Sequence, residues 1–410
     1  MIKKNLLNIT ISLLLSFLII YLSFSNTWTF FWNSLSIPAQ EPFSDLKAHI
    51  HFYNCFIKGI NIYNQPCELI PLGNANISTH PEIWLKIVHF FNLNNSVVYN
   101  IFVLTILTIY FFSLFKIYSN LKNFKNKLLF FIFFLSTTNL ILLERFATDI
   151  FIFILIFIIL NFNNKILKGL LIFIGILLKY YPIFLTSIFL KNKKYLFFFS
   201  SIFILFIFFI YSDQIKLVNN NILEVALIVA YGVRSITKAI YHLSIEYNFL
   251  INDANYSFFK NLIIIIFIIY SLLLIYLGFL RPQKFEISLN NQLTNYFIAG
   301  SSIYLGTFIF GSNFDYRLIF LVFTIPYVMS LKNELIKNIL IICYIISLNS
   351  FLIQHSEYFI SSDVRHWIYF LKAFIVYLCK FLVFTLLCFL IGSHLKIINF
   401  FKLNDKKKQN

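Results

Sequence analysis

The stretch Leu262–Leu280 reads LIIIIFIIYSLLLIYLGFL, an uncharged run that Arg281 follows directly. A helix rises about 1.5 Å per residue, so roughly 20 apolar residues cross the hydrocarbon core of a bilayer. Similar apolar runs recur along the chain and alternate with short polar gaps. Together with 60% apolar residues, 54 Phe and only 12% charge, this pattern predicts an all-α polytopic membrane protein.

Every second polar gap is rich in Lys and Arg. These basic gaps are residues 1–4, 116–127, 161–168, 191–194, 281–291, 331–337 and 402–408. Of the 16 acidic residues, only Glu286, Glu334 and Asp405 lie in these gaps, so the remaining 13 lie elsewhere, in the other gaps. Because Lys and Arg are retained in the cytoplasm during insertion, the basic gaps and both termini are predicted to be cytoplasmic.

The acidic gaps are then predicted to face outward, and any chemistry should take place on the outer face of the cytoplasmic membrane. The formal charge of +17 comes from separate short loops between apolar runs. Such loops indicate orientation and contact with anionic membrane lipids, and they argue against a nucleic-acid partner.

The apolar runs predict about twelve crossings. They are Leu6–Asn26, Val97–Phe115, Leu128–Leu143, Ala147–Leu160, Gly169–Tyr180, Ile183–Leu190, Tyr195–Tyr211, Phe259–Leu280, Tyr296–Gly311, Leu318–Leu331, Asn338–Phe351 and Trp367–His394. Joining the third run to the fourth and the fifth to the sixth gives ten crossings instead. Shallow hairpins with polar tips satisfy the charges better, because ionisable groups are costly at membrane depth.

This parse predicts one transmembrane domain over residues 1–401, with two larger outer loops at 33–96 and 212–257. Residues 402–410 should form a basic, disordered cytoplasmic tail. The five cysteines form no CxxC pair and show no metal-ligand spacing. Cys55 and Cys67 share the first outer loop and are able to pair, but free thiols are favoured because nothing else in the chain looks cross-linked.

Short polar clusters gather at the predicted outer boundary. The candidate site residues that they contain are Asp45, His80, Glu144, Arg145, Asp149, Lys179, Arg234, Asp315, Tyr316 and Arg317. Each cluster has a structural alternative. Glu144–Arg145 and Asp315–Arg317 are also interpretable as internal ion pairs, Lys179 as a side chain that snorkels to the interface, and Asp45 as a helix cap. Their convergence on one boundary favours function.

The chain has no Walker A loop, no GxGxxG and no DxD pair. An outward-facing enzyme has no activated nucleotide available, so its activated substrate should come from the bilayer, with a polyprenyl phosphate as carrier. Transfer from such a carrier needs a carboxylate that takes the acceptor proton, and cations that stabilise the leaving phosphate. Asp45 is the candidate base, and the candidate cations are Arg145, Lys179, Arg234 and Arg317. We expect no cofactor and no metal site.

At these residues the sequence resembles integral-membrane glycosyltransferases of the GT-C type, and most closely the glycosyltransferase 87 family of polyprenyl-phosphate-mannose-dependent mannosyltransferases. The similar segments are Asp45, Gly59-x-x-x-Tyr63, His80-Pro81-Glu82-Ile83-Trp84, Glu144-Arg145-x-x-x-Asp149, Lys179-Tyr180-Tyr181-Pro182 and Asn313-x-Asp315-Tyr316-Arg317-Leu318. They run in the expected order over about two thirds of the chain. Phe146 and Thr148 replace the Gly and Asn of the family's Glu-Arg-Gly-Asn turn, and Thr79-His80-Pro81 replaces a Tyr-Pro-Pro-type segment.

The resemblance implies a GT-C-like helical bundle that transfers a hexose, with mannose as the first candidate, from a polyprenyl-phosphate donor to a lipid or glycan acceptor. It implies Asp45 as general base and inversion at the sugar. Arg145, Lys179, Arg234 and Arg317 would bind the donor phosphate, while Glu144, Asp149, Asp315, Tyr316 and His80 would position groups or the acceptor. Two alternatives stay open: an O-antigen-type polysaccharide polymerase and a lipid-linked-sugar flippase or transporter. A structural subunit without activity ranks last.

Overall fold

The computed structural model describes residues 2–35, 37, 39, 41–67, 77–119, 121, 124–209, 230–246, 253–283, 291–311, 313–355 and 362–407. The chain divides into two compact units. Unit 1 comprises Met1–Asn123 and Leu140–Leu223, and unit 2 comprises Phe124–Asn139 and Glu224–Asn410. The single domain predicted over 1–401 stays a prediction, because this division does not say whether the units act together.

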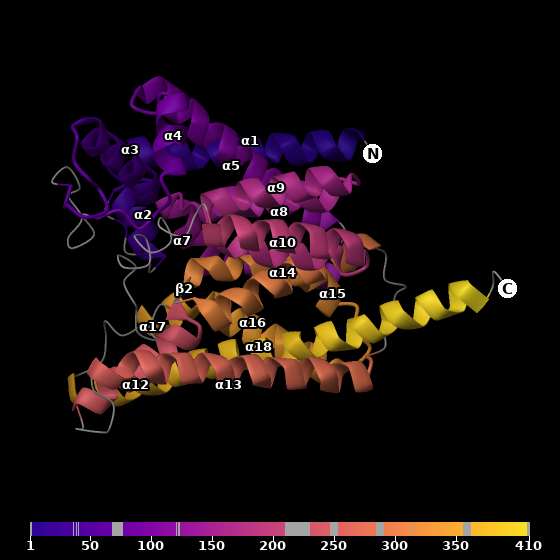
Figure 1. Ribbon diagram of the computed structural model, residues 1–410. Helices are drawn as coiled ribbons and strands as arrows, with labels where there is room; N and C mark the ends of the chain where they lie inside the picture. Colours follow the sequence, from indigo (N-terminus) through magenta and orange to yellow (C-terminus); the bar gives the residue numbers. More distant parts are fainter. Residues whose placement is uncertain are drawn as a thin grey trace. The chain divides into compact units, whose positions relative to one another are not determined.

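All the regular secondary structure in the described residues of unit 1 is helical. Its elements are α1 (Ile2–Phe24), α2 (Trp28–Ser34), α3 (Ser44–Ile57), α4 (Ile83–Phe90), α5 (Ser96–Ser119), α8 (Asp149–Asn161), α9 (Lys165–Leu178), the 3₁₀ helix η1 (Tyr181–Phe189) and α10 (Lys193–Phe209). Helix α1 packs along α5, and α5 contacts α8. Helix α9 packs against α8, η1 and α10, and α3 packs against α4 (Figure 1). Helix α7 (Thr137–Arg145) crosses the unit boundary at Leu140.

Unit 2 contains the remaining elements. They are α6 (Phe124–Phe134), β1 (Ala230–Tyr231), α12 (Val233–Glu246), α13 (Asp253–Leu280), α14 (Asn291–Phe310), β2 (Asn313–Phe314), the 3₁₀ helix η2 (Asp315–Thr324), α15 (Ile325–Val328), α16 (Glu334–Leu348), α17 (Ser350–His355) and α18 (Ser362–Lys407). Strands β1 and β2 pair antiparallel, with Ala230 opposite Phe314 and Tyr231 opposite Asn313. This two-residue ladder is a small exception to the predicted all-α class.

Four helical segments among the described residues are long and apolar enough to cross a membrane. They are Leu6–Phe24, Ser96–Ser119, Asn255–Leu280 and Leu371–Leu395, and the bent pair Asn126–Phe134 with Thr137–Arg145 counts as a fifth if it is one span. These segments confirm the class, an all-α polytopic membrane protein. The other predicted crossings fall on elements that do not meet this test, so a bundle of ten to twelve crossings stays a prediction.

The two ambiguous runs between Leu128 and Leu190 are each broken at their polar tip. Helix α7 ends at Arg145 and α8 begins at Asp149; α9 ends at Leu178 and η1 begins at Tyr181. Both parses place an interruption at these tips, so the choice between shallow hairpins and single interrupted spans stays a prediction. The run Leu128–Leu143, predicted as one helix, is divided between α6 and α7.

Helices α13 and α18 have the most extensive pairing in unit 2, and Figure 1 shows them side by side, in orange-red and yellow. Gly278 of α13 lies against the backbone of Phe389 and Ser393, and Gly392 of α18 lies against the backbone of Ile275. A Cβ at either glycine would overlap the facing helix. Small residues at this contact let the two backbones approach closely, which is how helices associate in lipid.

Several predicted segments lie partly outside the described residues. They include much of the second outer loop, residues 68–76 of the first and residues 284–290 of one basic gap. The predicted disordered tail at 402–410 is wrong for its first part, because α18 continues to Lys407.

Candidate functional site

The ten predicted site residues fall into two groups. Unit 1 holds Asp45, His80, Glu144, Arg145, Asp149 and Lys179, and unit 2 holds Arg234, Asp315, Tyr316 and Arg317. The unit 1 residues come from four separate stretches of sequence, and their contacts bring these stretches together.

Asp45 lies in the first turn of α3 and is half-buried. The residue at the N-cap is Phe43, and no side chain caps this end, so the interpretation of Asp45 as the helix cap is wrong. The Phe43 amide instead donates a hydrogen bond of 3.1 Å to the Glu144 carbonyl. This bond joins the start of α3 to the end of α7, across about a hundred residues of sequence.

The Glu144–Arg145 turn places a buried acid beside an accessible cation. The Glu144 side chain is 3% exposed and that of Arg145 is 38% exposed, and Arg145 Nε lies 3.9 Å from Glu144 Oε2. At this distance the pair is a loose ion pair rather than a hydrogen bond. The Asp45 carboxylate is close enough to repel that of Glu144. Two carboxylates and one guanidinium therefore share this corner of unit 1.

Two bulky residues in the left-handed backbone region flank this corner. Phe43 has φ 58° and Phe146 has φ 51°, and their rings meet at a centroid distance of 5.6 Å. Left-handed φ is a genuine outlier for a large side chain, and such strain persists where the surrounding structure demands it, often at functional sites. Phe146 stands where the similar family has glycine, and it adopts the conformation that glycine favours. The presence of phenylalanine in place of glycine at position 146 is therefore compatible with a left-handed backbone in this turn.

Asp149, at the start of α8, forms a buried ion pair with Lys179, which directly follows α9. Lys179 Nζ lies 2.5 Å from Asp149 Oδ2, and the Tyr181 hydroxyl donates to Oδ1 at 2.5 Å. The side chains of Asp149 and Lys179 are 0% and 8% exposed. Lys179 is thus held by a carboxylate rather than snorkelling to the interface. A phosphate bound by Lys179 would therefore contact a lysine that is already paired with Asp149.

A cluster of three rings lies one helical turn from Asp45. The His49 ring stacks on Trp84, with centroids 4.7 Å apart and planes 10° apart, and meets the His80 ring edge-on at 4.5 Å. Trp84 Nε1 donates to the Leu178 carbonyl at 3.2 Å, next to Lys179. Burial, followed by the charge of Lys179, lowers the pKa of His49 from 6.5 to about 3, so this imidazole is neutral at physiological pH.

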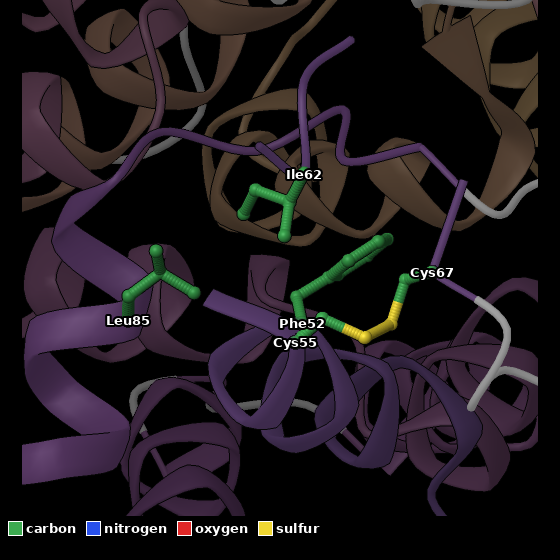
Figure 2. Packing of buried hydrophobic residues seen from close by; sticks show 5 residues of the cluster. All are labelled: Phe52, Cys55, Ile62, Cys67 and Leu85. Carbon is green, nitrogen blue, oxygen red and sulfur yellow. A yellow bond between two sulfur atoms is a disulfide. The ribbon is translucent and has the colours of Figure 1, made fainter. Parts of the chain in front are cut away.

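The loop after α3 is fastened to that helix. A disulfide joins Cys55 to Cys67, so the expectation of free thiols is wrong for this pair. Figure 2 shows it in a small core with Phe52, Ile62 and Leu85. The spacing of 12 residues in one loop was compatible with pairing, but only the fold brings the two Cα atoms to 6.0 Å.

The segment Gly59-x-x-x-Tyr63 closes on the segment that carries His80. The Tyr63 hydroxyl donates to the His80 carbonyl at 3.0 Å. Burial, followed by the charge of Glu82, raises the pKa of Tyr63 to about 12, so the hydroxyl keeps its proton and remains a donor. The two family-like segments of the first outer loop are therefore parts of one local structure.

In unit 2 the predicted pairing of Asp315 with Arg317 is wrong. Asp315 instead pairs with Lys380 of α18, whose Nζ lies 2.7 Å and 2.8 Å from the two carboxylate oxygens. Lys380 also donates to the Ala230 carbonyl at 3.3 Å, and Ser350 donates to Asp315 Oδ2. Lys380 is fully buried and Asp315 is 3% exposed. This arrangement favours a structural role for Asp315 over positioning a substrate.

The other predicted residues of unit 2 lie near the short ladder. Arg317 donates to Asn313 Oδ1 at 2.5 Å, and the Tyr316 ring stacks on Phe314 at 5.7 Å. Arg234 is half-buried in the first turn of α12, and its Nε has no hydrogen-bond partner among the described residues. These contacts leave a phosphate-binding role for the two arginines as a prediction.

The predicted site residues did not include His49, Trp84, Tyr181 and Lys380, although Trp84 and Tyr181 stand in segments that carry the resemblance. His49 is four residues after Asp45, which places both on one face of a helix, and that spacing could have found it. Lys380 interrupts the apolar run Leu371–Leu395. A lysine in such a run implies a partner, so this signal was present too.

The unit 1 cluster combines the groups that glycosyl transfer from a lipid phosphate needs. It has a half-buried carboxylate, an accessible arginine and neutral hydrogen-bonding rings on locally braced elements. Among the described residues no group of three or more His, Cys, Asp or Glu is arranged to hold a metal ion. Comparison with protein-family models, curated proteins and solved structures found no match to this chain.

Proposed function

We propose that the chain is a GT-C-like membrane glycosyltransferase. In this proposal a hexose such as mannose moves from a polyprenyl phosphate to a lipid or glycan acceptor on the outer face of the cytoplasmic membrane. The observation that carries the proposal is the junction between α3 and α7, where the Phe43–Glu144 hydrogen bond brings Asp45 beside Glu144 and Arg145. Asp45 and the Glu144–Arg145 turn belong to two separate polar clusters, and each was selected from the sequence without reference to the other.

In the proposed reaction Asp45 accepts the proton of an acceptor hydroxyl as its oxygen attacks the anomeric carbon. The bond between that carbon and the phosphate oxygen breaks, and polyprenyl phosphate leaves with the electron pair. Arg145 stabilises the phosphate charge, and a partly desolvated site strengthens this interaction. Attack from the face opposite the phosphate inverts the sugar configuration.

The Cys55–Cys67 disulfide supports the outward orientation of the first loop. Disulfides persist in oxidising compartments and are rare in the cytosol. The disulfide lies on the same helix as Asp45, so the base would face the compartment in which nucleotide-activated sugars are absent. A carrier lipid is then the available activated donor.

The test is sugar transfer in purified membranes supplied with radiolabelled polyprenyl-phosphate mannose or polyprenyl-phosphate glucose. Asp45→Asn should lower transfer by about 10²–10⁴-fold, because only the proton acceptor is lost. Glu41→Gln is the matched control, since Glu41 is an acid of the same loop that pairs with Lys47 at 2.7 Å, and it should retain transfer. Wild-type turnover by Asp45→Asn would rule out the assigned base. Absence of transfer from both donors in wild type would favour the polymerase or the transporter.

A further inference from the structure

The three-ring cluster of His49, His80 and Trp84 contains a buried polar atom that the fold does not satisfy. His49 is 2% exposed, and its Nε2 has no hydrogen-bond partner among the described residues. Buried polar atoms are nearly always hydrogen-bonded, so a ligand or a water molecule is expected to supply the missing partner of this nitrogen. His49 is on α3 one turn beyond Asp45, hence on the same face as the proposed base.

The protonation state of His49 restricts the kind of ligand. Its imidazole is neutral, and the positive charge of Lys179 opposes protonation. A neutral ring nitrogen exchanges hydrogen bonds with a hydroxyl but offers no charge to a phosphate. The half-buried His80 ring beside it adds a ring surface, and a sugar presents both hydroxyls and apolar C–H faces. The chemistry of the cluster therefore fits a hexose ring better than the lipid phosphate.

The cluster is braced from two directions. Trp84 is held by the Leu178 carbonyl, and the His80 backbone by the Tyr63 hydroxyl. The disulfide at Cys55 ties α3 to the loop that carries Tyr63. Side chains held in place before binding lose little freedom when a ligand arrives, which is the usual construction of a specific subsite.

We propose that His49 and His80 form a hexose subsite, in which His49 Nε2 hydrogen-bonds a sugar hydroxyl and the half-buried His80 ring contacts the sugar, while the buried Trp84 ring holds His49 in place by stacking. The inference rests on the proposed function for the identity of the reacting sugar. Binding of a hexose, however, is measurable without any transfer, so the hexose subsite and the transfer reaction can be tested independently. The hexose belongs either to the donor or to the acceptor, and the shared chemistry is a neutral hexose hydroxyl.

The experiment measures equilibrium binding of radiolabelled octyl α-mannoside, polyprenyl-phosphate mannose and sugar-free polyprenyl phosphate to the full chain in nanodiscs. His49→Phe keeps a ring to stack on Trp84 but loses both nitrogens, and His49→Gln restores a hydrogen-bonding nitrogen. We expect His49→Phe to weaken hexoside binding about tenfold, as the loss of one hydrogen bond does. His49→Gln should bind within about threefold of wild type. His51→Phe, a half-buried histidine two residues on, is the matched control.

The three ligands identify which hexose occupies the subsite. Weaker binding of polyprenyl-phosphate mannose, with unchanged binding of polyprenyl phosphate, would assign the subsite to the donor sugar. Weaker binding of octyl mannoside alone would assign it to the acceptor sugar. In an Asp45→Asn background, His49→Phe should cause the same relative loss of hexoside affinity, so failed transfer and a failed subsite are distinguishable. Unchanged affinity of His49→Phe for both hexosides, or an equal loss in His51→Phe, would overturn the proposal.

Discussion

Each unit of this protein contains a buried Asp–Lys pair, and the two pairs have different surroundings. In unit 2, Lys380 contacts both oxygens of Asp315 and the Ala230 carbonyl, so each of its three N–H bonds has an acceptor. Thr138 and Ser350 also donate to Asp315, to its carbonyl and its carboxylate respectively. The pair thereby joins five segments of unit 2 that are far apart in sequence, which is the behaviour of a structural cross-link.

In unit 1, Asp149 receives a hydrogen bond from Tyr181 as well as the ion pair from Lys179. Lys179 is also close enough to influence His49, whose ring belongs to the proposed hexose subsite. The Asp149–Lys179 pair therefore adjoins the proposed reaction centre. The Asp315–Lys380 pair is instead buried, and its hydrogen bonds go to structural groups of unit 2. Burying an ion pair gives little net stability, so it is the neighbours of each pair that indicate its purpose.

The largest effect should come from breaking the pair of unit 2. Lys380→Met leaves the Asp315 carboxylate buried without its cation, which costs about 3–5 kcal/mol. Lys179→Met should cost less, because the Lys179 side chain is 8% exposed whereas that of Lys380 is fully buried, so water can partly compensate at the unit 1 pair. Thermal unfolding of the detergent-purified variants would rank them. Asp315→Asn/Lys380→Met removes both charges and should recover part of the loss, and equal melting of Lys380→Met and wild type would contradict the cross-link.

The next effect distinguishes the Asp149–Lys179 pair from the Asp315–Lys380 pair by the rate of sugar transfer rather than by stability. Asp149→Asn/Lys179→Met should lower sugar transfer about 100-fold, equivalent to about 2.7 kcal/mol of activation free energy. Its unit 2 counterpart, Asp315→Asn/Lys380→Met, should stay within a few-fold of wild type per folded molecule, because that pair has a structural role. Transfer assays normalised to monodisperse protein would measure both. Similar losses in the two double variants would remove the distinction between the pairs.

The smallest effect is a pH dependence specific to unit 1. The pKa of His49 is lowered to about 3 in the folded chain, from an ordinary value of 6.5. The unfolded chain therefore binds the proton first as pH falls. Stability from the neutral imidazole is complete above pH 6.5 and decreases from pH 6.5 towards pH 3, by about 1.4 kcal/mol per pH unit.

His49→Phe should remove this part of the pH dependence and His51→Phe should not. The measurement is the unfolding midpoint of each variant at pH 7 and pH 5. A wild-type slope in His49→Phe would mean that other groups of unit 1 carry the acid sensitivity.

Much of the candidate site could be located from residue type and order, because ionisable groups beside apolar runs are conspicuous. The break at Glu144–Arg145 is an example. Partner choice was less predictable. Arg317 was the nearest cation to Asp315 in sequence, but the buried carboxylate pairs with Lys380, 65 residues away, because α14 and α16 pack against both η2 and α18.

The sequence by itself determined the helical membrane class, the positions of the longest spans and the residues available for chemistry, since these depend on hydrophobic length and local charge. Only the tertiary structure decided which of these residues meet. The Cys55–Cys67 disulfide, the stacking of His49 on Trp84 and the left-handed conformation of Phe146 all depend on contacts between distant segments. Local propensity does not encode such contacts: their energies are gained only after the chain has closed the intervening loops and packed the helices together.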